Sequence, residues 1–346
     1  MQSLIEAVQH NCDIVDARHG SEFGMCTYLL KMREMYRWQQ GLPLGAVLDR
    51  QAVGDWLSAR EAQLESLEDA DFVALTVDGE TLDPFDADRL NSMLGPHGLV
   101  YSAGLVQGAR PHFFLAELEA EERAEHGFVL RVSGRELARG LNAPPGMTRG
   151  TQIFVRREAL RRYLWEKYES WLWSRPDNAM ARAVACYPFD TALDEALESM
   201  TSAEMTVVEA HERGEYLAGL AFGESWEAML LDLESTPAEL MARAVRDHLA
   251  DCTQTLPMLV ERRLEPSLHF FIANLGAMRK HLFPGLHSGY ADWLERTDWG
   301  ALERLARAGA RHWLATAERM LEIHGRHGPA AATRIAAAVE SSRLGV

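Results

Sequence analysis

The sequence contains little cysteine and no long apolar segment. Its four cysteines are widely spaced and form no CxxC pair, so we expect free thiols and no disulfide framework. No run of about 18 consecutive apolar residues occurs. The first six residues also lack the basic and apolar regions of a signal peptide. We therefore expect a cytoplasmic protein that has no membrane partner.

The motifs of several large enzyme classes are also missing. There is no GxGxxG, no GxxxxGK[ST] and no GxSxG, which excludes recognisable dinucleotide-binding, P-loop and α/β-hydrolase sites. The segment His211-Glu212-x-x-Glu215 lacks the second histidine of the HExxH zinc-protease motif. The C-terminal helical segments contain no ExxH, so the ferritin-like di-iron pattern is absent.

Positive charge is scarce. The 346-residue chain has a formal net charge of −16, which argues against a nucleic-acid partner. Between positions 61 and 88 there are ten acids and no base. Such a run is usually a solvated face, and the alternative is a docking surface for a basic partner. The 47% hydrophobic content is that of an ordinary folded protein.

The hydrophobic periodicity changes along the chain. Helical patterns cover most of the first 66 residues, with Asp49 as an N-cap, and Asp78-Gly79 marks a hairpin turn. From about Leu99 the period is two, and turns at 108–111 and near Gly127 predict an antiparallel meander. The predicted strands are Leu99–Ala103, His112–Leu118, Phe128–Val132 and Gln152–Val155.

Beyond Asp190 the pattern is helical nearly to the end. Thr201-x-x-Glu204 and Thr236-Pro237-x-Glu239 resemble capping boxes, a helix is expected over 267–283, and Pro257 should kink or end the segment 237–263. We predict a mainly α protein (α+β overall). An N-terminal α+β domain with a small antiparallel β meander would span 1–175, and a C-terminal antiparallel helical bundle would span 190–346.

Histidines and carboxylates recur on the inward faces of these predicted helices. His211 and Glu215 are four residues apart on an apolar face, and Gly214 beside them allows a neighbour to approach closely. His248 and Cys252 share the next helical stripe, with Asp251 one step aside. Buried carboxylates cost several kcal/mol unless they are paired or metal-bound. The candidate metal ligands are His211, Glu215, His248, Asp251 and His281.

These residues are compatible with two classes of function. In a metal-dependent enzyme, Fe or Zn would suit these N and O ligands and activate water or dioxygen for a small-molecule substrate, with Glu212 or Cys252 as the catalytic groups near the metal. In a non-enzymatic adaptor or scaffold, the acidic 61–88 face would bind a partner. The polar groups could also form a pocket without metal, or a structural network with neighbouring arginines. The charged joint Asp16–Glu22 is a solvated turn or a ligand-contacting loop.

Several stretches together resemble a family of uncharacterised bacterial cytoplasmic proteins of about this length. The resemblance covers nearly the whole chain and implies no activity, cofactor or catalytic residue. The stretches that carry it are Cys12–His19, Tyr28–Glu34, Ser133–Ala138, Arg175–Met180 and Ala244–Asp251.

Overall fold

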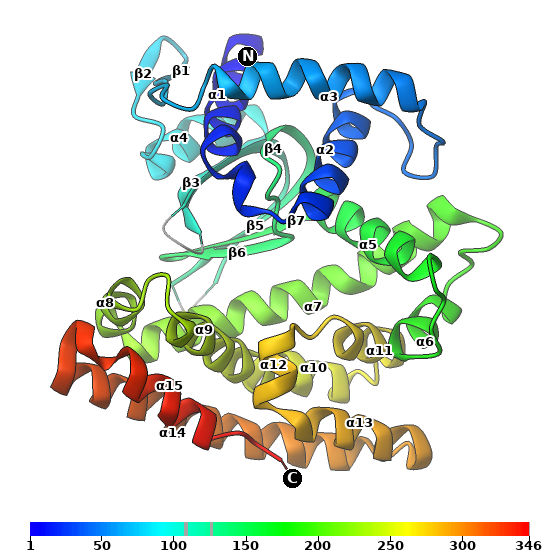
Figure 1. Cartoon of the computed structure of the whole chain (residues 1–346), viewed down its shortest axis with the longest axis vertical. Coiled ribbons are helices and arrows are strands. Elements are labelled where there is room, and N and C mark those ends of the chain that lie inside the picture. The colour runs from blue at the N-terminus through cyan, green and yellow to red at the C-terminus, as the bar shows by residue number, and fades with distance from the viewer. Residues whose placement is uncertain (107–109, 125–126, 346) are drawn as a thin grey trace. The chain divides into compact units, whose positions relative to one another are not determined.

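The chain forms two compact units in this computed structural model, which describes residues 1–106, 110–124 and 127–345. The first unit comprises Met1–Pro145 and Phe154–Trp165, and the second comprises Gly146–Ile153 and Glu166–Val346. Helices dominate, and the small antiparallel sheets lie in the N-terminal half (Figure 1), so the predicted mainly α class is confirmed. Among the described helices, none is long and apolar enough to cross a membrane.

The first unit begins with helices. Asp49 is the N-cap of α3, where its carboxylate accepts a hydrogen bond from the Ala52 amide at 2.8 Å, as its position in the sequence predicts. The helical elements of this part are α1 (Gln2–His19), the 3-10 turn η1 (Gly20–Glu22), α2 (Met25–Gln39), α3 (Arg50–Glu65), α4 (Ala87–Leu94) and the 3-10 turn η2 (Gly95–His97).

Two sheets complete the first unit. Asp78 and Gly79, both with positive φ, form the predicted turn of the small β1–β2 hairpin. In the larger sheet β3, β4 and β5 are successive antiparallel neighbours, and β7 follows β5. α1 packs on β4 and β5, and α4 packs on β3. Gly108 and Ala109 of the first predicted turn lie outside the described residues. The strands are β1 (Leu75–Val77), β2 (Glu80–Leu82), β3 (Leu99–Val106), β4 (Arg110–Arg123), β5 (Val129–Arg139) and β7 (Gln152–Arg156).

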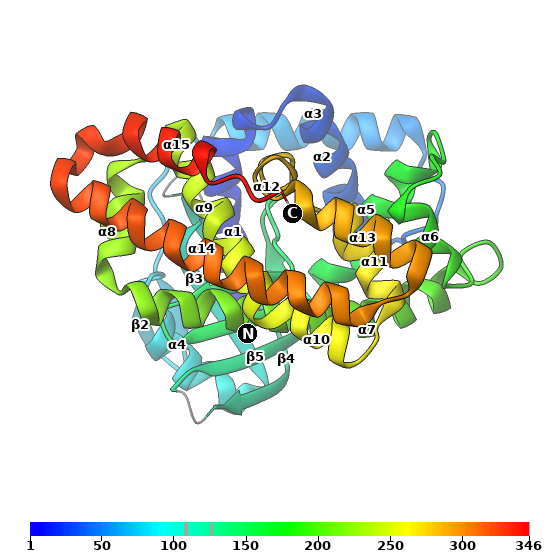
Figure 2. The ribbon, with the colours of Figure 1, turned by 90° about the horizontal axis from the view of Figure 1, so that it is seen from below.

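The described part of the second unit is helical apart from the short strand β6 (Gly146–Arg149) and the first two residues of β7. The long helix α14 contacts α8, α9, α10, α13 and α15 along its length (Figure 2), so one apolar core joins them. α5 (Arg157–Leu172) belongs partly to each unit. The other helices are α6 (Ala179–Ala185), α7 (Leu193–Phe222), α8 (Glu224–Asp232), α9 (Pro237–Ala250), α10 (Leu256–Glu261), α11 (Glu265–Ala273), α12 (Ala277–Leu282), α13 (Pro284–Arg296), α14 (Trp299–His327), the 3-10 turn η5 (Gly328–Ala331) and α15 (Ala332–Ser341).

Capping signals have mixed outcomes in this unit. Thr236 caps α9 as predicted. The capping box predicted at Thr201 is wrong, because Thr201 lies inside the continuous helix α7, where its hydroxyl donates to the Leu197 carbonyl at 2.6 Å. The single helix predicted over 267–283 is interrupted between α11 and α12, where the Asn274 side chain donates to the Phe270 carbonyl at 2.8 Å.

Pro257 changes the helical geometry in the way its chemistry requires. The five residues of η4 (Asp251–Thr255) form a π-helical turn directly before α10, in which Pro257 occupies the first turn. Proline has no N–H and its ring crowds the carbonyl four residues earlier, so the chain widens ahead of it. The predicted disturbance of segment 237–263 is thereby confirmed, and it places Asp251 at the start of the wide turn.

Candidate metal centre

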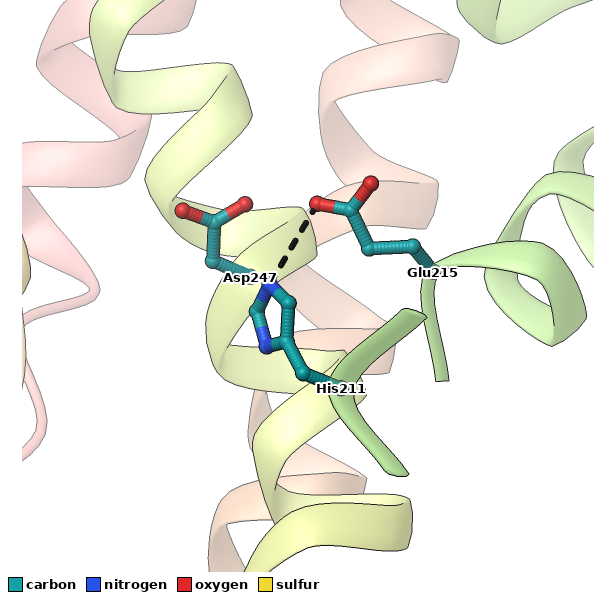
Figure 3. A group of neighbouring side chains, drawn as sticks. All are labelled: His211, Glu215 and Asp247. Atoms are coloured by element: carbon teal, nitrogen blue, oxygen red, sulfur yellow. Dashed lines mark ion pairs between the residues drawn. The ribbon is translucent and has the colours of Figure 1, made fainter. Parts of the chain in front are cut away.

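Three side chains of the second unit converge on one point (Figure 3). His211 and Glu215 project from successive turns of α7, and Asp247 comes from α9. One ligand atom from each lies within 4.8 Å of the other two, and Nε2 of His211 is 3.6 Å from Oε1 of Glu215. The i, i+4 spacing on α7 puts the first two on one face. All three side chains are partly buried.

A glycine allows α7 and α9 to meet this closely. An added Cβ at Gly214 would lie 2.7 Å from the Cα and from the carbonyl oxygen of Ala250. Real Cβ atoms do not come so near to backbone, so any larger residue would push the helices apart. Gly214 therefore sets the separation at which α9 and the following π turn reach His211, as expected from the sequence.

Asp251 orients the imidazole. Its Oδ1 lies 2.8 Å from Nδ1 of His211, and the aspartate is buried. With Nδ1 as the donor, Nε2 faces the carboxylate of Glu215. A histidine whose second nitrogen is held by a carboxylate is the usual arrangement of a metal-binding imidazole.

Two arginines balance part of the negative charge. The guanidinium of Arg246 lies 2.9 Å from Oε2 of Glu215, and Arg279 of α12 forms an ion pair with Asp251. The backbone carbonyl of Arg279 accepts a hydrogen bond from Nε2 of His248 at 3.0 Å. His248 thus contributes to the position of Arg279 and is not one of the three converging side chains.

The charges shift the protonation of the cluster. Burial acts to raise the pKa of Glu215, but Arg246 and His211 outweigh burial and hold that pKa well below its ordinary value. Burial acts to lower the pKa of His211, but Glu215 outweighs it and raises that pKa. Burial and the charge of Glu215 together raise the pKa of Asp247. The raised pKa values favour the protonated forms of His211 and Asp247, and the lowered pKa favours the ionised form of Glu215.

Glu212 lies beside the cluster on an adjacent face of α7. Its Oε2 accepts a hydrogen bond from the Thr148 hydroxyl at 2.8 Å, and a Cβ at Gly146 would come within 2.5 Å of its Oε1. Burial, with the nearby charge of Glu215, raises the pKa of Glu212 to about 7. A carboxyl group that titrates near neutrality can exchange a proton under physiological conditions.

The other predicted site residues are not among the converging side chains and have partners of their own. The ring of His248 stacks on Trp313 with centroids 4.9 Å apart, and burial lowers its pKa to about 3. Cys252 is buried against α14, where a Cβ at Gly309 would lie 2.5 Å from its Sγ, and burial raises the pKa of the thiol. His281 is exposed and pairs with Glu340 at 2.8 Å.

Of the predicted metal ligands, the structure brings together His211, Glu215 and Asp251, and it adds Asp247. The apolar pattern predicts that His248 of α9 and Cys252 of η4 point into the site, but these two residues pack on aromatic and small residues of α14. The signal that could have found Asp247 is its spacing: Asp247 and Asp251 are four residues apart, as His211 and Glu215 are.

Comparison with known proteins supplies a family but no activity. Residues 3–156 match the model described as "Family of unknown function (DUF6866) N-terminal domain", and residues 161–342 match the corresponding C-terminal domain. No curated protein and no solved structure matches the chain. Every residue of the cluster on α7, α9 and η4 falls within the C-terminal match. The chain belongs to the DUF6866 family, whose function is unknown.

Proposed function

We propose that this protein binds one Fe or Zn ion through His211 Nε2, Glu215 and Asp247, and that the site serves a metal-dependent reaction on a small molecule. The observation that carries the proposal is the imidazole orientation. Asp251 holds Nδ1, and Nε2 is left facing the carboxylate of Glu215, with Asp247 beside it. One nitrogen and two oxygen ligands suit both metals.

The distances fit a cation after small side-chain movements. Ligand atoms about 2.1 Å from one tetrahedral ion lie about 3.4 Å from each other. The His211–Glu215 separation of 3.6 Å already matches, and the whole group lies within 4.8 Å. A change of about 1 Å, which carboxylate rotamers supply, would bring all three ligand atoms to coordination distance.

The charge of the neighbourhood also fits a divalent ion. The cluster holds four carboxylates, and two guanidinium groups compensate two of them when all are ionised and His211 is neutral. One divalent cation would neutralise the remainder. Its binding would compete with protons at Glu212, whose pKa is raised to about 7, and at His211 and Asp247, whose pKa values are also raised. The carboxylates are Glu212, Glu215, Asp247 and Asp251, and the guanidinium groups are Arg246 and Arg279.

Three protein ligands leave a coordination position open, as catalytic sites require. A divalent ion there would lower the pKa of a coordinated water to about 7. Glu212 is the group suited to accept a proton, because its pKa is raised to about 7 and the Thr148 hydroxyl fixes its carboxyl group. Cys252 is not suited to nucleophilic chemistry, because burial keeps its thiol protonated.

The competing interpretation is a structural network without metal, in which protonated His211 bridges Asp251 and Glu215. Metal analysis separates the two. Tag-free protein is treated with chelator and then titrated with ZnCl₂ by calorimetry, and anaerobically with Fe²⁺. We expect one ion per chain. Glu215→Gln and Asp247→Asn should each weaken binding at least tenfold.

Glu209→Gln is the matched control for this titration, because Glu209 lies on the same helix and pairs with Arg213 at 2.8 Å outside the cluster. Binding to this variant should be unchanged. If wild-type protein takes up no ion, or if the two ligand variants bind as well as the wild type, the metal proposal fails. The Glu212→Gln variant should still bind the ion, because Glu212 is not one of the three ligands. It should lose any turnover that the wild-type protein shows, which tests the enzymatic part separately.

The proposal includes a reducing compartment, and the cysteines support it. All four cysteines are free, and Cys26 and Cys186 are exposed. Exposed free thiols are typical of cytosolic proteins. A basic macromolecular partner for the acidic 61–88 face, the alternative function, stays a prediction.

A further inference from the structure

A second site lies in the first unit and shares no residue with the metal centre. It is an open depression of about 660 Å³ where α1 ends, α2 begins and the last two turns of α3 pass. This volume falls in the range of small-molecule pockets. We call it the α1–α3 pocket, and its walls differ sharply in chemistry.

One wall is apolar and aromatic. Phe23, Met25, Tyr28 and Leu29 line it, and Met25 is 80% exposed and Leu29 44% exposed. Large side chains left this open to solvent in one concave place indicate a surface that something covers. The aromatic rings also offer their negative faces to a cation. Lys31, whose Nζ lies 5.2 Å from the centroid of Phe23, shows this contact within the chain itself.

The opposite wall is acidic. Glu61, Glu65 and Glu68 line it, all exposed, and no lysine or arginine is among the lining residues. Over the part of the chain that the structure describes, no ion pair joins these three glutamates to a basic side chain. Arg18, which comes near, donates instead to the backbone carbonyls of Glu68 and Ala70.

A buried carboxyl group forms part of the lining. Asp16 is 6% exposed, both of its oxygens accept a hydrogen bond from the Leu141 amide, and the guanidinium of Arg60 lies 3.7 Å from its Oδ2. Tyr28, Glu61 and Asp16 line the same pocket, and burial with the charges of these two acids raises the pKa of the Tyr28 phenol against the opposing charge of Arg60. The acidic and aromatic groups thus line the same pocket.

Two of the three helix ends at the pocket also favour positive charge. The carboxyl ends of α1 and α3 meet the pocket, and the amino end of α2 is the one that opposes them. Helix carboxyl ends favour cations. Two such ends, together with three exposed glutamates, make the pocket attractive to positive charge.

We propose that the α1–α3 pocket binds a small organic amine, a protonated amino group carried on an aromatic or apolar body. The glutamates would hold the ammonium group, and Phe23, Tyr28 and Leu29 would cover the body. An anion of the same shape would meet three carboxylates and would be rejected. The pocket would therefore select ligands that carry both a positive charge and an apolar body.

Calorimetry of the full chain with tryptamine tests the proposal, with indole-3-acetate as the probe of equal shape and opposite charge. We expect tryptamine to bind at least tenfold more tightly, and the difference to shrink as salt rises. Each of Glu61→Gln and Glu65→Gln should weaken tryptamine binding about two- to fivefold, the scale of an exposed ion pair. Met25→Ala should weaken it through the apolar wall.

Asp69→Asn is the control, because Asp69 is exposed and acidic, adjoins Glu68 and does not line the pocket. Its affinity for tryptamine should equal that of the wild type. These exposed substitutions leave the fold intact, which circular dichroism verifies. Equal binding of both indoles, binding of neither, or binding of trilysine without tryptamine would overturn the assignment, the last in favour of a basic peptide partner.

Discussion

Nδ1 of His211 lies 2.8 Å from Oδ1 of Asp251, across the contact between α7 and the π turn. This hydrogen bond joins two segments that are 40 positions apart in the sequence. It selects the tautomer and the direction of the imidazole, on which any metal chemistry at this site would depend.

The first prediction concerns this bond. Asp251→Asn keeps the size of the side chain but removes the charge that holds the His211 N–H and pairs with Arg279. We expect affinity for Zn²⁺ to fall about 10- to 100-fold, the usual effect of losing such a partner. Competition with a chromophoric chelator measures this. Undiminished affinity would mean that the histidine does not need the aspartate.

The second prediction separates the two histidines. His211→Asn should abolish Zn²⁺ binding, whereas His248→Phe should retain it, because His248 stacks on Trp313 and bonds to the Arg279 carbonyl. The His248 variant should instead lose about 1–3 kcal/mol of unfolding free energy through the unpaired carbonyl. Urea unfolding and metal titration of both variants report the contrast. Loss of metal in both variants alike would contradict it.

The third prediction uses two glycines of the same helix. Gly214→Ala introduces a methyl group 2.7 Å from the backbone of Ala250, so it should destabilise the protein by about 1–3 kcal/mol and weaken metal binding. Gly219→Ala meets nothing within 4 Å and should stabilise α7 by about 0.5–1 kcal/mol. Thermal unfolding of both variants shows whether each substitution raises or lowers the stability. A neutral Gly214→Ala would show that the helices have room to move.

The fourth prediction concerns pH. Burial raises the pKa of Glu204 to about 8 from the ordinary 4.5, and the group is 2% exposed. The folded state then retains a proton that the unfolded state releases. The contribution of this group to the unfolding free energy is therefore complete below about pH 4.5 and is lost as the pH rises to 8. The loss is several kcal/mol in total. Glu204→Gln should remove this pH dependence.

The control for that measurement is Glu261→Gln, at the exposed end of α10. The unfolding free energy is measured with denaturant at pH 5, 6.5, 8 and 9. It should change with pH equally for this variant and the wild type, and less steeply for Glu204→Gln. If the Glu204 variant kept the wild-type slope, the carboxyl would have to be ionised in the folded state at neutral pH.

Local sequence signals predict much of the fold. Side chains that complete helix ends, such as Asp49 and Thr236, act within three residues, and so the sequence reveals them directly. The Asp78–Gly79 turn is equally local. The prediction at Thr201 is wrong because the same hydroxyl can bond back to a carbonyl inside a helix, and only the packing of α7 decides which bond forms.

The site is harder to predict, because it depends on which face of α9 meets α7. His248 and Asp247 are adjacent in the sequence and point about 100° apart on a helix. Apolar periodicity favours the stripe of His248 and Cys252 as the inward one, and that stripe is indeed buried. The bundle has more than one inward direction, however, and the one facing α7 carries Asp247 and Asp251.

The π turn at Asp251–Thr255 has a consequence for the length of this segment. A wide turn accommodates about one more residue than an α-helical turn, which rotates the downstream residues by about 100° relative to the upstream ones. Asp247 ahead of the turn and Asp251 at its start can therefore face α7, while Leu256 and Leu259 beyond it stay in the core. Single-residue insertions or deletions here would disrupt either the cluster or the core. In relatives of this chain, substitutions at these positions should therefore be more frequent than changes in the length of the segment.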